Sequence, residues 1–258
     1  MTVIVPFPLF LFIFPKYIYI MYKVIFFDLD DTLWDFQANA KVAMKQLFDN
    51  SKLNVLFPAF ENFYDKYQAV NHELWRCYSN GTVTKEKLMV DRFLIPLAEA
   101  GCNDVNLACR LGDEYLNLLA LQSILVDNAL EILAYLKPHY RLALVSNGFK
   151  EVQYNKLKRS NIISFFEEII LSDEVGYNKP DPNFFSIALK RMNVANSEAV
   201  VVGDNYETDI VGAFNSNIDS VFFNRCSEDC IFYPKATHVI SNLKDLKRIF
   251  PIGLIYNK

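Results

Sequence analysis

The spacing of hydrophobic positions changes twice along the chain and predicts three kinds of segment. Residues 22–27 are expected to form the first strand, because residues 24–27 are a short apolar run typical of a buried strand. The acids Asp28, Asp30 and Asp31 follow it. The next hundred residues lack strand-like alternation and carry apolar positions at helical spacing. Helices are expected over residues 38–48, 60–78 and 106–121, with another that starts after Thr84 and ends before Pro96.

From residue 127 the chain alternates between helical stretches and short apolar runs. A helix capped by Asp127 would bury Leu130, Leu133 and Leu136. The other expected elements are a helix over residues 150–159, a helix capped by Asp181, and strands over 141–145, 168–171, 199–202, 221–223 and 238–240. This alternation predicts an α/β fold, a doubly wound parallel sheet with the all-helical segment inserted after its first strand.

The predicted organisation is a Rossmann-like core interrupted by an all-helical insertion. The core takes residues 21–35 and 123–258, and the insertion takes residues 36–122. Residues 1–20 form an apolar N-terminal extension that contains three prolines. It has neither the basic start nor the cleavage site of a signal peptide, and its prolines disfavour a membrane helix. A mis-chosen start codon and a real membrane anchor both stay open as interpretations of this extension.

Composition and charge exclude several classes of protein. Hydrophobic residues make up 52% of the 258 residues, with only 8 glycines and 10 prolines, which excludes disordered and fibrous proteins. The net charge of −4, without a dense Lys/Arg run, gives no basis for nucleic-acid binding. The five scattered cysteines suit a reducing compartment rather than a disulfide framework. We therefore expect a cytoplasmic protein, either a monomer or a homodimer, whose partner is a small molecule.

Polar residues follow the points where the predicted strands end. Ligands of open parallel sheets bind beyond the carboxyl ends of the strands. The residues found there are Asp28, Ser146-Asn147-Gly148, Lys179, Asp204 and, five residues further on, Asp209. We therefore expect acids, a hydroxyl group and a lysine to meet at one edge of the sheet.

This combination of residues suits phosphoryl transfer through an aspartate. A carboxylate can act as the nucleophile and divide hydrolysis into two easier steps. Because the transferred group is anionic, Mg²⁺ and a lysine would have to neutralise charge before a carboxylate approaches it. Mg²⁺ prefers oxygen ligands, which the acids and the phosphate supply. The second acid, Asp30, would protonate the leaving oxygen and later activate water.

In order and spacing, these segments resemble the four motifs of haloacid-dehalogenase-type (HAD) phosphatases. The resemblance implies that Asp28 is the nucleophile and Asp30 the general acid and base. It implies that Ser146 binds the transferring phosphoryl group, that Asn147 contacts the substrate, and that Lys179 neutralises charge. The implied metal ligands are Asp28, Asp30 through its backbone carbonyl, Asp204 and Asp209. The helical insertion resembles the mobile C1 cap of the family, so the likeness covers the chain from residue 21 onward.

The insertion also resembles the pyrimidine 5′-nucleotidase (noncanonical pyrimidine nucleotidase) branch of this family. That branch removes the 5′-phosphate of nucleoside monophosphates, including non-canonical ones. The residues expected to contact the substrate are Asn71, Trp75, Tyr78 and Arg92. Aromatic rings could stack on a base and a guanidinium could make a polar contact, although the same side chains could instead pack the cap.

Other functions are compatible with parts of this pattern. A related phosphatase that acts on sugar phosphates or other small esters would use the same motifs. A 2-haloacid dehalogenase needs no metal and normally lacks the second acid, which Asp30 supplies here. A phospho-accepting signalling domain also places acids, a hydroxyl group and a lysine around Mg²⁺, but it is about half as long and has no cap. Asp31 is expected to have no catalytic role, because neighbouring residues of a strand face opposite ways.

Overall fold

The computed structural model describes residues 22–225 and 233–252 and contains a six-stranded parallel sheet. Its strands lie in the order β3-β2-β1-β4-β5-β6, so that β1 lies at the centre and the connections cross over in both directions. The strands are β1 (Val24–Phe27), β2 (Arg141–Ser146), β3 (Glu168–Leu171), β4 (Ala199–Gly203), β5 (Asp219–Phe223) and β6 (His238–Ile240). The expected doubly wound parallel sheet is confirmed.

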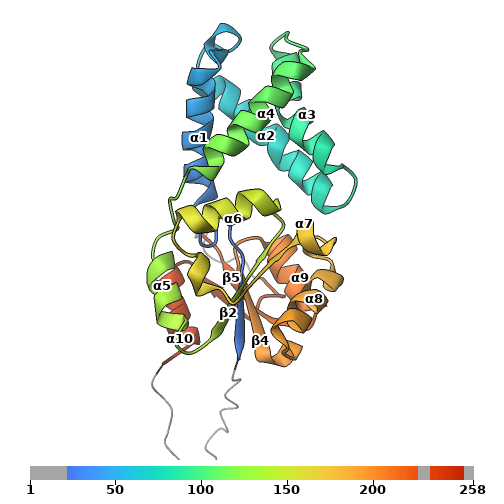
Figure 1. Ribbon diagram of the computed structural model, residues 1–258. Coiled ribbons are helices and arrows are strands. Elements are labelled where there is room, and N and C mark those ends of the chain that lie inside the picture. The colour runs from blue at the N-terminus through green and yellow to red at the C-terminus, as the bar shows by residue number, and fades with distance from the viewer. Residues whose placement is uncertain (1–21, 226–232, 253–258) are drawn as a thin grey trace, which may run out of the picture.

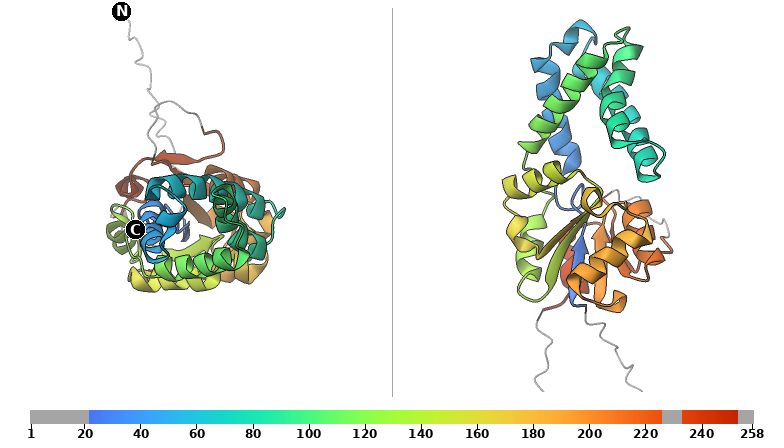
Figure 2. Two further views of the ribbon diagram at one scale, coloured as in Figure 1. Left: turned by 90° about the horizontal axis from the view of Figure 1, so that it is seen from above. Right: turned by 45° about the vertical axis from the view of Figure 1, so that its right-hand side comes forward.

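Helices cover both faces of this sheet (Figures 1 and 2). They are α5 (Ala129–Leu136), α6 (Lys150–Arg159), α7 (Ser172–Val175), α8 (Pro182–Met192), α9 (Val211–Asn215) and α10 (Leu246–Ile249). Alternate residues of β1 point to opposite faces: Ile25 and Phe27 belong to the cluster that includes α5 and α6, whereas Val24 and Phe26 pack with α8. Because β1 is buried on both faces, its sequence is a continuous apolar run.

Four helices between β1 and β2 form a cap above the carboxyl edge of the sheet (Figure 1). They are α1 (Phe36–Asn50), α2 (Phe60–Ser79), α3 (Lys85–Glu99) and α4 (Val105–Ala120). Rings from three of them meet inside the cap: the centroids of Tyr67 and Phe93 lie 5.0 Å apart, and those of Tyr67 and Tyr115 lie 5.7 Å apart. Much of the aromatic content of the chain therefore builds the interior of the cap.

A buried asparagine joins the two chain segments that connect the cap to the core. The Asn39 side chain donates from Nδ2 to the carbonyl oxygens of Asp35 and Ile124, at 2.7 and 2.8 Å. Its Oδ1 accepts from the Ile124 backbone N–H at 3.0 Å. Since all these groups are paired, the outgoing and returning segments are held side by side at the base of the cap.

Two details of the expected helices are wrong. The helix expected to be capped by Asp127 has Asn128 at its N-cap, and Leu130 is 51% exposed while Leu133 and Leu136 are buried. The helix expected to end before Pro96 continues through it to Glu99. Burial of Pro96 against the cap interior offsets the lost backbone hydrogen bond, which the local pattern does not reveal.

The described part of the chain has no helix with the length and apolar character needed to cross a membrane. Both interpretations of residues 1–20 concern a segment that lies outside the described residues.

Candidate active site

Lys179 lies between two buried carboxylates beyond the carboxyl ends of the central strands. Its Nζ is 2.7 Å from Asp28 Oδ1 and 2.6 Å from Asp209 Oδ1, and it donates to the Val145 carbonyl at 3.1 Å. The lysine is 2% exposed, so its ammonium group depends on these three acceptors in place of water. The structure thus brings together the predicted nucleophile and the predicted phosphate-neutralising lysine.

Burial and neighbouring charges raise the pKa values of Asp28 and Asp204. Burial raises the pKa of Asp28 to about 7; the charge of Lys179 opposes this, and those of Asp209 and Asp30 add to it. Burial and the charges of Asp28 and Asp209 raise the pKa of Asp204 well above its ordinary range. Burial lowers the pKa of Lys179, but Asp209 and Asp28 outweigh it and hold the value above the ordinary one. The cluster thus holds more carboxyl groups than one ammonium group can balance.

Three carboxylates of this cluster could hold a metal ion. One oxygen from each of Asp28, Asp204 and Asp209 lies within 4.8 Å of the others. Asp209 uses one oxygen for Lys179, and its other oxygen accepts from the Asn205 N–H at 3.1 Å. Asp28 and Asp204 each keep an oxygen without a hydrogen-bond partner among residues 22–225 and 233–252. An oxygen-rich, electron-rich cluster of this kind fits a hard divalent cation such as Mg²⁺.

Gly203 and Thr32 help to place the acids that follow strand β4. A Cβ on Gly203, at the end of β4, would lie 2.3 Å from Asp209 Oδ2, so any side chain there would displace the carboxylate. Thr32 Oγ1 donates to Asp204 Oδ1 at 2.9 Å and accepts from the Asp204 N–H at 3.0 Å. Thr32 therefore fixes Asp204 relative to the turn after β1.

Asp30 points toward the cap side of the site and contacts helix α6. Its Oδ1 lies 2.6 Å from Lys156 Nζ, and its Oδ2 accepts from Gln153 Nε2 at 2.8 Å. The same Gln153 nitrogen donates to Ser146 Oγ at 2.7 Å. Asp30 and Ser146, two residues with different predicted roles, are therefore linked through one side chain.

Asn147 holds the backbone of Lys179. The Asn147 side chain donates from Nδ2 to the Lys179 carbonyl at 2.9 Å, and its Oδ1 accepts from the Lys179 N–H at 2.8 Å. These two bonds fasten the loop that carries the lysine to the end of β2. The predicted contact of Asn147 with the substrate stays a prediction.

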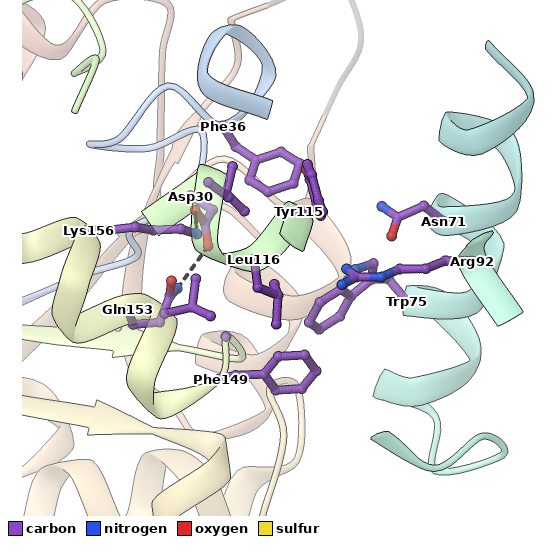
Figure 3. Close-up of a pocket in the computed structure, with 13 residues that line it drawn as sticks. Asp30, Phe36, Asn71, Trp75, Arg92, Tyr115, Leu116, Phe149, Gln153 and Lys156 are labelled. Atoms are coloured by element: carbon purple, nitrogen blue, oxygen red, sulfur yellow. Dashed lines mark hydrogen bonds and ion pairs between the residues drawn. The ribbon is translucent and has the colours of Figure 1, made fainter. Parts of the chain in front are cut away.

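A pocket lies between the core and the cap (Figure 3). Asp30, Gln153 and Lys156 line it from the core side, and Asn71, Trp75 and Arg92 line it from α2 and α3. Most of its other walls are apolar: Phe36, Tyr115, Leu116, Leu119, Phe149 and Val152. Three of the four cap residues expected to contact the substrate therefore share one pocket with the predicted general acid.

Tyr78, the fourth of these cap residues, lies outside the pocket lining. Its ring packs edge-on against Trp75 and Phe149, with centroid distances of 5.6 and 6.0 Å. Trp75 and Phe149 are tilted by 32° at 5.3 Å. Tyr78 thus belongs to the contact between cap and core, where Lys85 Nζ also lies 3.0 Å from Asp173 Oδ2.

Arg92 is a buried cation that no carboxylate of the described residues pairs with. It is 3% exposed, and its Nε and Nη2 have no hydrogen-bond partner among those residues. Its guanidinium lies over the rings of Phe93 and Tyr115, at 5.4 and 5.3 Å. Rings stabilise a cation only in part, so the free donors are suited to a ligand with oxygen acceptors.

Asp31 is expected to have no catalytic role because neighbouring strand residues face opposite ways, and this reason is wrong. The strand ends at Phe27, and Asp31 lies in the following turn with a left-handed φ of 58°. Its carboxylate accepts from the backbone N–H and side chain of Gln37, both at 3.2 Å, and pairs with Arg225 at 3.3 Å. Asp31 therefore supports the start of the cap, and this follows from the turn rather than from strand alternation.

Sequence reasoning missed Gln153, Lys156 and Thr32. Gln153 and Lys156 are three residues apart, which places them on one face of α6, the helix that follows Ser146-Asn147-Gly148. That spacing, directly after a motif at a strand end, is the signal that could have found them. Thr32 gives no such signal, because its role depends on the distance between two loops that are 172 residues apart.

A comparison with protein families matches residues 22–217 to the haloacid dehalogenase-like hydrolases. This chain is a HAD-like hydrolase. The resemblance inferred from the four motifs is thereby confirmed, and so is the expectation that the chain is an enzyme of the hydrolase class.

Known proteins with similar sequences include phosphatases named for different substrates. The HAD hydrolase YfnB of Bacillus subtilis (strain 168) is 28% identical over 90% of this chain and 96% of its own length. The pyrimidine 5′-nucleotidase YjjG of Escherichia coli (strain K12) is 30% identical over 87% of this chain and 96% of its own length. The glyceraldehyde 3-phosphate phosphatase of Methanothermobacter thermautotrophicus is 31% identical, with coverages of 79% and 86%. This HAD hydrolase therefore has relatives among phosphatases of nucleotides and of sugar phosphates.

A solved structure supports the same family. The crystal structure of YfnB, described as bound to magnesium and as revealing interdomain movement, has a TM-score of 0.80 and 27% identity. It covers 90% of this chain and 100% of its own. The HAD fold of the core and its helical cap are thus shared with a magnesium-bound neighbour.

Proposed function

We propose that this HAD hydrolase is a Mg²⁺-dependent phosphatase that hydrolyses nucleoside 5′-monophosphates, preferably of pyrimidines, through an aspartyl-phosphate intermediate. The observation that carries the proposal is the contact of Lys179 with Asp28, in a cluster where three carboxylates lie within 4.8 Å of one another. The relative named as a pyrimidine 5′-nucleotidase supports the choice of substrate. The cytosolic location expected from the sequence belongs to this proposal as well.

In the first half of the proposed reaction, an Asp28 carboxylate oxygen forms a bond to phosphorus. The bond between phosphorus and the 5′-oxygen breaks, and Asp30 gives its proton to that oxygen. Lys179, already paired with Asp28, and the Ser146 hydroxyl would contact the phosphoryl oxygens. In the second half, Asp30 takes a proton from water, whose oxygen attacks phosphorus and releases inorganic phosphate from Asp28.

The proposed metal ligands are Asp28, Asp204, the backbone carbonyl of Asp30, and Asp209. Asp28 and Asp204 have the carboxylate oxygens left free by hydrogen bonding, whereas both oxygens of Asp209 are already engaged. We therefore assign Asp209 mainly to holding Lys179. A bound Mg²⁺ would supply neutralisation of the negative charge that the acids and the phosphate bring together.

The pocket between core and cap is the proposed site for the nucleoside. Its walls are largely aromatic and aliphatic, which suits the flat faces of a base. Arg92 has free donors there, and Asn71 offers an amide, so both could bind the carbonyl oxygens of a pyrimidine. Trp75 would contact the base or sugar, while Tyr78 would act by supporting Trp75.

A second candidate is a phosphatase of sugar phosphates or similar small esters. It is favoured by the relative named as a glyceraldehyde 3-phosphate phosphatase, whose identity is close to that of the nucleotidase. The same core chemistry would serve both substrates, so only the pocket distinguishes them.

The proposal is tested by measuring phosphate release from dUMP, UMP, dTMP and a set of sugar phosphates, with Mg²⁺ and with a chelator. We expect turnover of the pyrimidine nucleotides that the chelator abolishes. Asp28→Asn should lower kcat by at least about 10³-fold, because the nucleophile is lost. Asp113→Asn, an exposed acid of the cap, serves as the matched control and should leave the rate unchanged.

Each contrary result removes a different part of the proposal. Activity that persists in the chelator or in Asp28→Asn would exclude the metal-dependent aspartyl-phosphate mechanism. Preference for sugar phosphates over all three nucleotides would keep the phosphatase and replace the nucleotidase with the second candidate.

A further inference from the structure

Helix α6 occupies both oxygens of the predicted general acid. Lys156 Nζ lies 2.6 Å from Asp30 Oδ1, and Gln153 Nε2 donates to Asp30 Oδ2 at 2.8 Å (Figure 3). The two donors are one helical turn apart on a rigid element, so they fix the orientation of the carboxyl group. Nothing in the four motifs assigns a role to either residue.

Gln153 uses its amide nitrogen twice. The second bond goes to Ser146 Oγ at 2.7 Å, which ties the predicted general acid to the residue predicted to bind the phosphoryl group. The side chain passes directly over Gly148, where an added Cβ would lie 2.3 Å from Gln153 Cδ and Nε2. The glycine after Ser146 and Asn147 is therefore required for the contact between Gln153 and the two site residues.

Lys156 is placed so that its charge acts on Asp30. It is 3% exposed, and its ammonium lies over the rings of Trp34 and Phe36, at 4.5 and 5.4 Å. Asp30 is its only ion-pair partner among the described residues. Leaving a buried ammonium group without its partner is strongly destabilising, so the contact between Lys156 and Asp30 is part of the architecture of the site.

We propose that Lys156 and Gln153 are positioning residues for the protonation of the leaving group, an inference that rests on the proposed phosphatase function. Gln153 holds the Asp30 carboxyl group in the pocket, next to the phosphoryl-binding Ser146. When the proton passes from Asp30 to the leaving oxygen, the oxygen's bond to phosphorus breaks and Asp30 becomes a carboxylate. Without substrate, Asp30 is a carboxylate paired with Lys156 at 2.6 Å, so it takes up this proton from solvent when the anionic substrate binds. After the proton has passed to the leaving oxygen, the Lys156 ammonium stabilises the carboxylate that remains.

Two phosphate esters separate this role from a merely structural one. A nucleoside 5′-phosphate has a poor leaving group that needs the proton, whereas p-nitrophenyl phosphate has a good one that leaves without it. The ratio kcat/KM reports the steps up to loss of the leaving group, so the later hydrolysis of the phosphoenzyme does not obscure it. Lys156→Met removes the charge and keeps an apolar stem beside Trp34 and Phe36.

We expect Lys156→Met to lower kcat/KM for UMP by roughly 10²-fold and for p-nitrophenyl phosphate by no more than about threefold. Gln153→Leu should likewise lower kcat/KM more for UMP than for p-nitrophenyl phosphate, since it removes the hydrogen bond to Asp30 Oδ2. Lys158→Met is the matched control on the exposed side of α6 and should change neither value. A thermal melt of each variant identifies any that fails to fold. If either Lys156→Met or Gln153→Leu does not fold, the kcat/KM values of the remaining variant test the proposal.

The inference is overturned if the folded variants lose the same factor on both esters, or if kcat/KM for UMP is unchanged. The activity of Asp28→Asn tests the proposed phosphatase function separately. If Asp28→Asn retains activity, the proposed function fails; if Asp28→Asn is inactive and the two esters respond equally in Lys156→Met, only the positioning role fails.

Discussion

The core buries the cations Lys179 and Lys156 and the cap buries Arg92, and Lys179 and Arg92 differ most in their partners. Lys179 of the core contacts two carboxylates and a backbone carbonyl, so its donors are satisfied. Arg92 of the cap has two buried nitrogens without a hydrogen-bond partner, and no ion-pair partner, among the described residues. The core cation is balanced before any substrate arrives, whereas the cap cation has donors left for a ligand.

This difference fits two roles: Lys179 belongs to the reaction centre, and Arg92 belongs to the pocket that recognises the substrate. A reaction centre has to be preorganised, and its charges are held by fixed partners. A recognition group gains most from a ligand when its donors are buried and unpaired in the free protein, because binding then removes a cost. The same comparison predicts that the two cations respond in opposite ways when their charge is removed.

The largest effect is expected from Lys179→Met. It leaves Asp28 and Asp209 facing each other without a cation, which should lower the free energy of unfolding by about 3–5 kcal/mol. Urea unfolding in a chelator measures this, and activity should be lost as well. Lys190→Met on the exposed side of α8 is the control. Near-equal stability of the two variants would mean that the core cation does not hold the acids.

Arg92→Met should affect substrate binding without weakening the fold. Loss of a charged donor should cost roughly 1.5–3 kcal/mol in kcat/KM for UMP, or about 10- to 150-fold. The free energy of unfolding should stay the same or rise, because an unpaired buried charge is removed. Arg110→Met, an exposed arginine of the cap, is the comparison. A destabilised variant with unchanged nucleotide turnover would make Arg92 a packing residue instead.

The smallest effect is expected at the contact between cap and core. The Lys85–Asp173 pair is partly exposed, so Lys85→Met should change KM by an amount equivalent to about 0.2–1 kcal/mol, and less at high salt. Lys87→Met provides the control, because its partner Asp91 lies in the same helix. A steady-state titration of UMP at two salt concentrations tests this. Equal responses of the two variants would show that the bridging pair has no special effect on substrate binding.

The parallel sheet and the four motifs could be read from the sequence because they depend on local patterns. A continuous apolar run followed by Asp28 identifies both a strand and its carboxyl end. Parallel strands end at the same edge, so the meeting of Asp28, Lys179, Asp204 and Asp209 follows from the strand assignments alone.

Features that depend on packing between distant segments could not be read in this way. Helical spacing alone did not show that Leu130 is half exposed or that Pro96 lies inside a helix. The contact of Gln153 with Asp30 joins residues 123 positions apart, and only the folded sheet brings α6 over the turn after β1. Arg92 was found as a candidate, but its lack of a partner is visible only in three dimensions.

The central claim, that Asp28 carries the phosphoryl group during turnover, is tested most directly by trapping the intermediate. Asp30→Asn should slow hydrolysis of the phosphoenzyme, whereas its formation from p-nitrophenyl phosphate needs no proton from Asp30. Acid quenching early in the reaction of this variant with p-nitrophenyl phosphate and Mg²⁺ should therefore capture the phosphoenzyme. Mass spectrometry of the digested protein should then find one phosphoryl group on the peptide with Asp28, and none when Asp28→Asn is added. A phosphoryl group on another residue, or rapid phosphate release with no trapped phosphoenzyme, would contradict the mechanism.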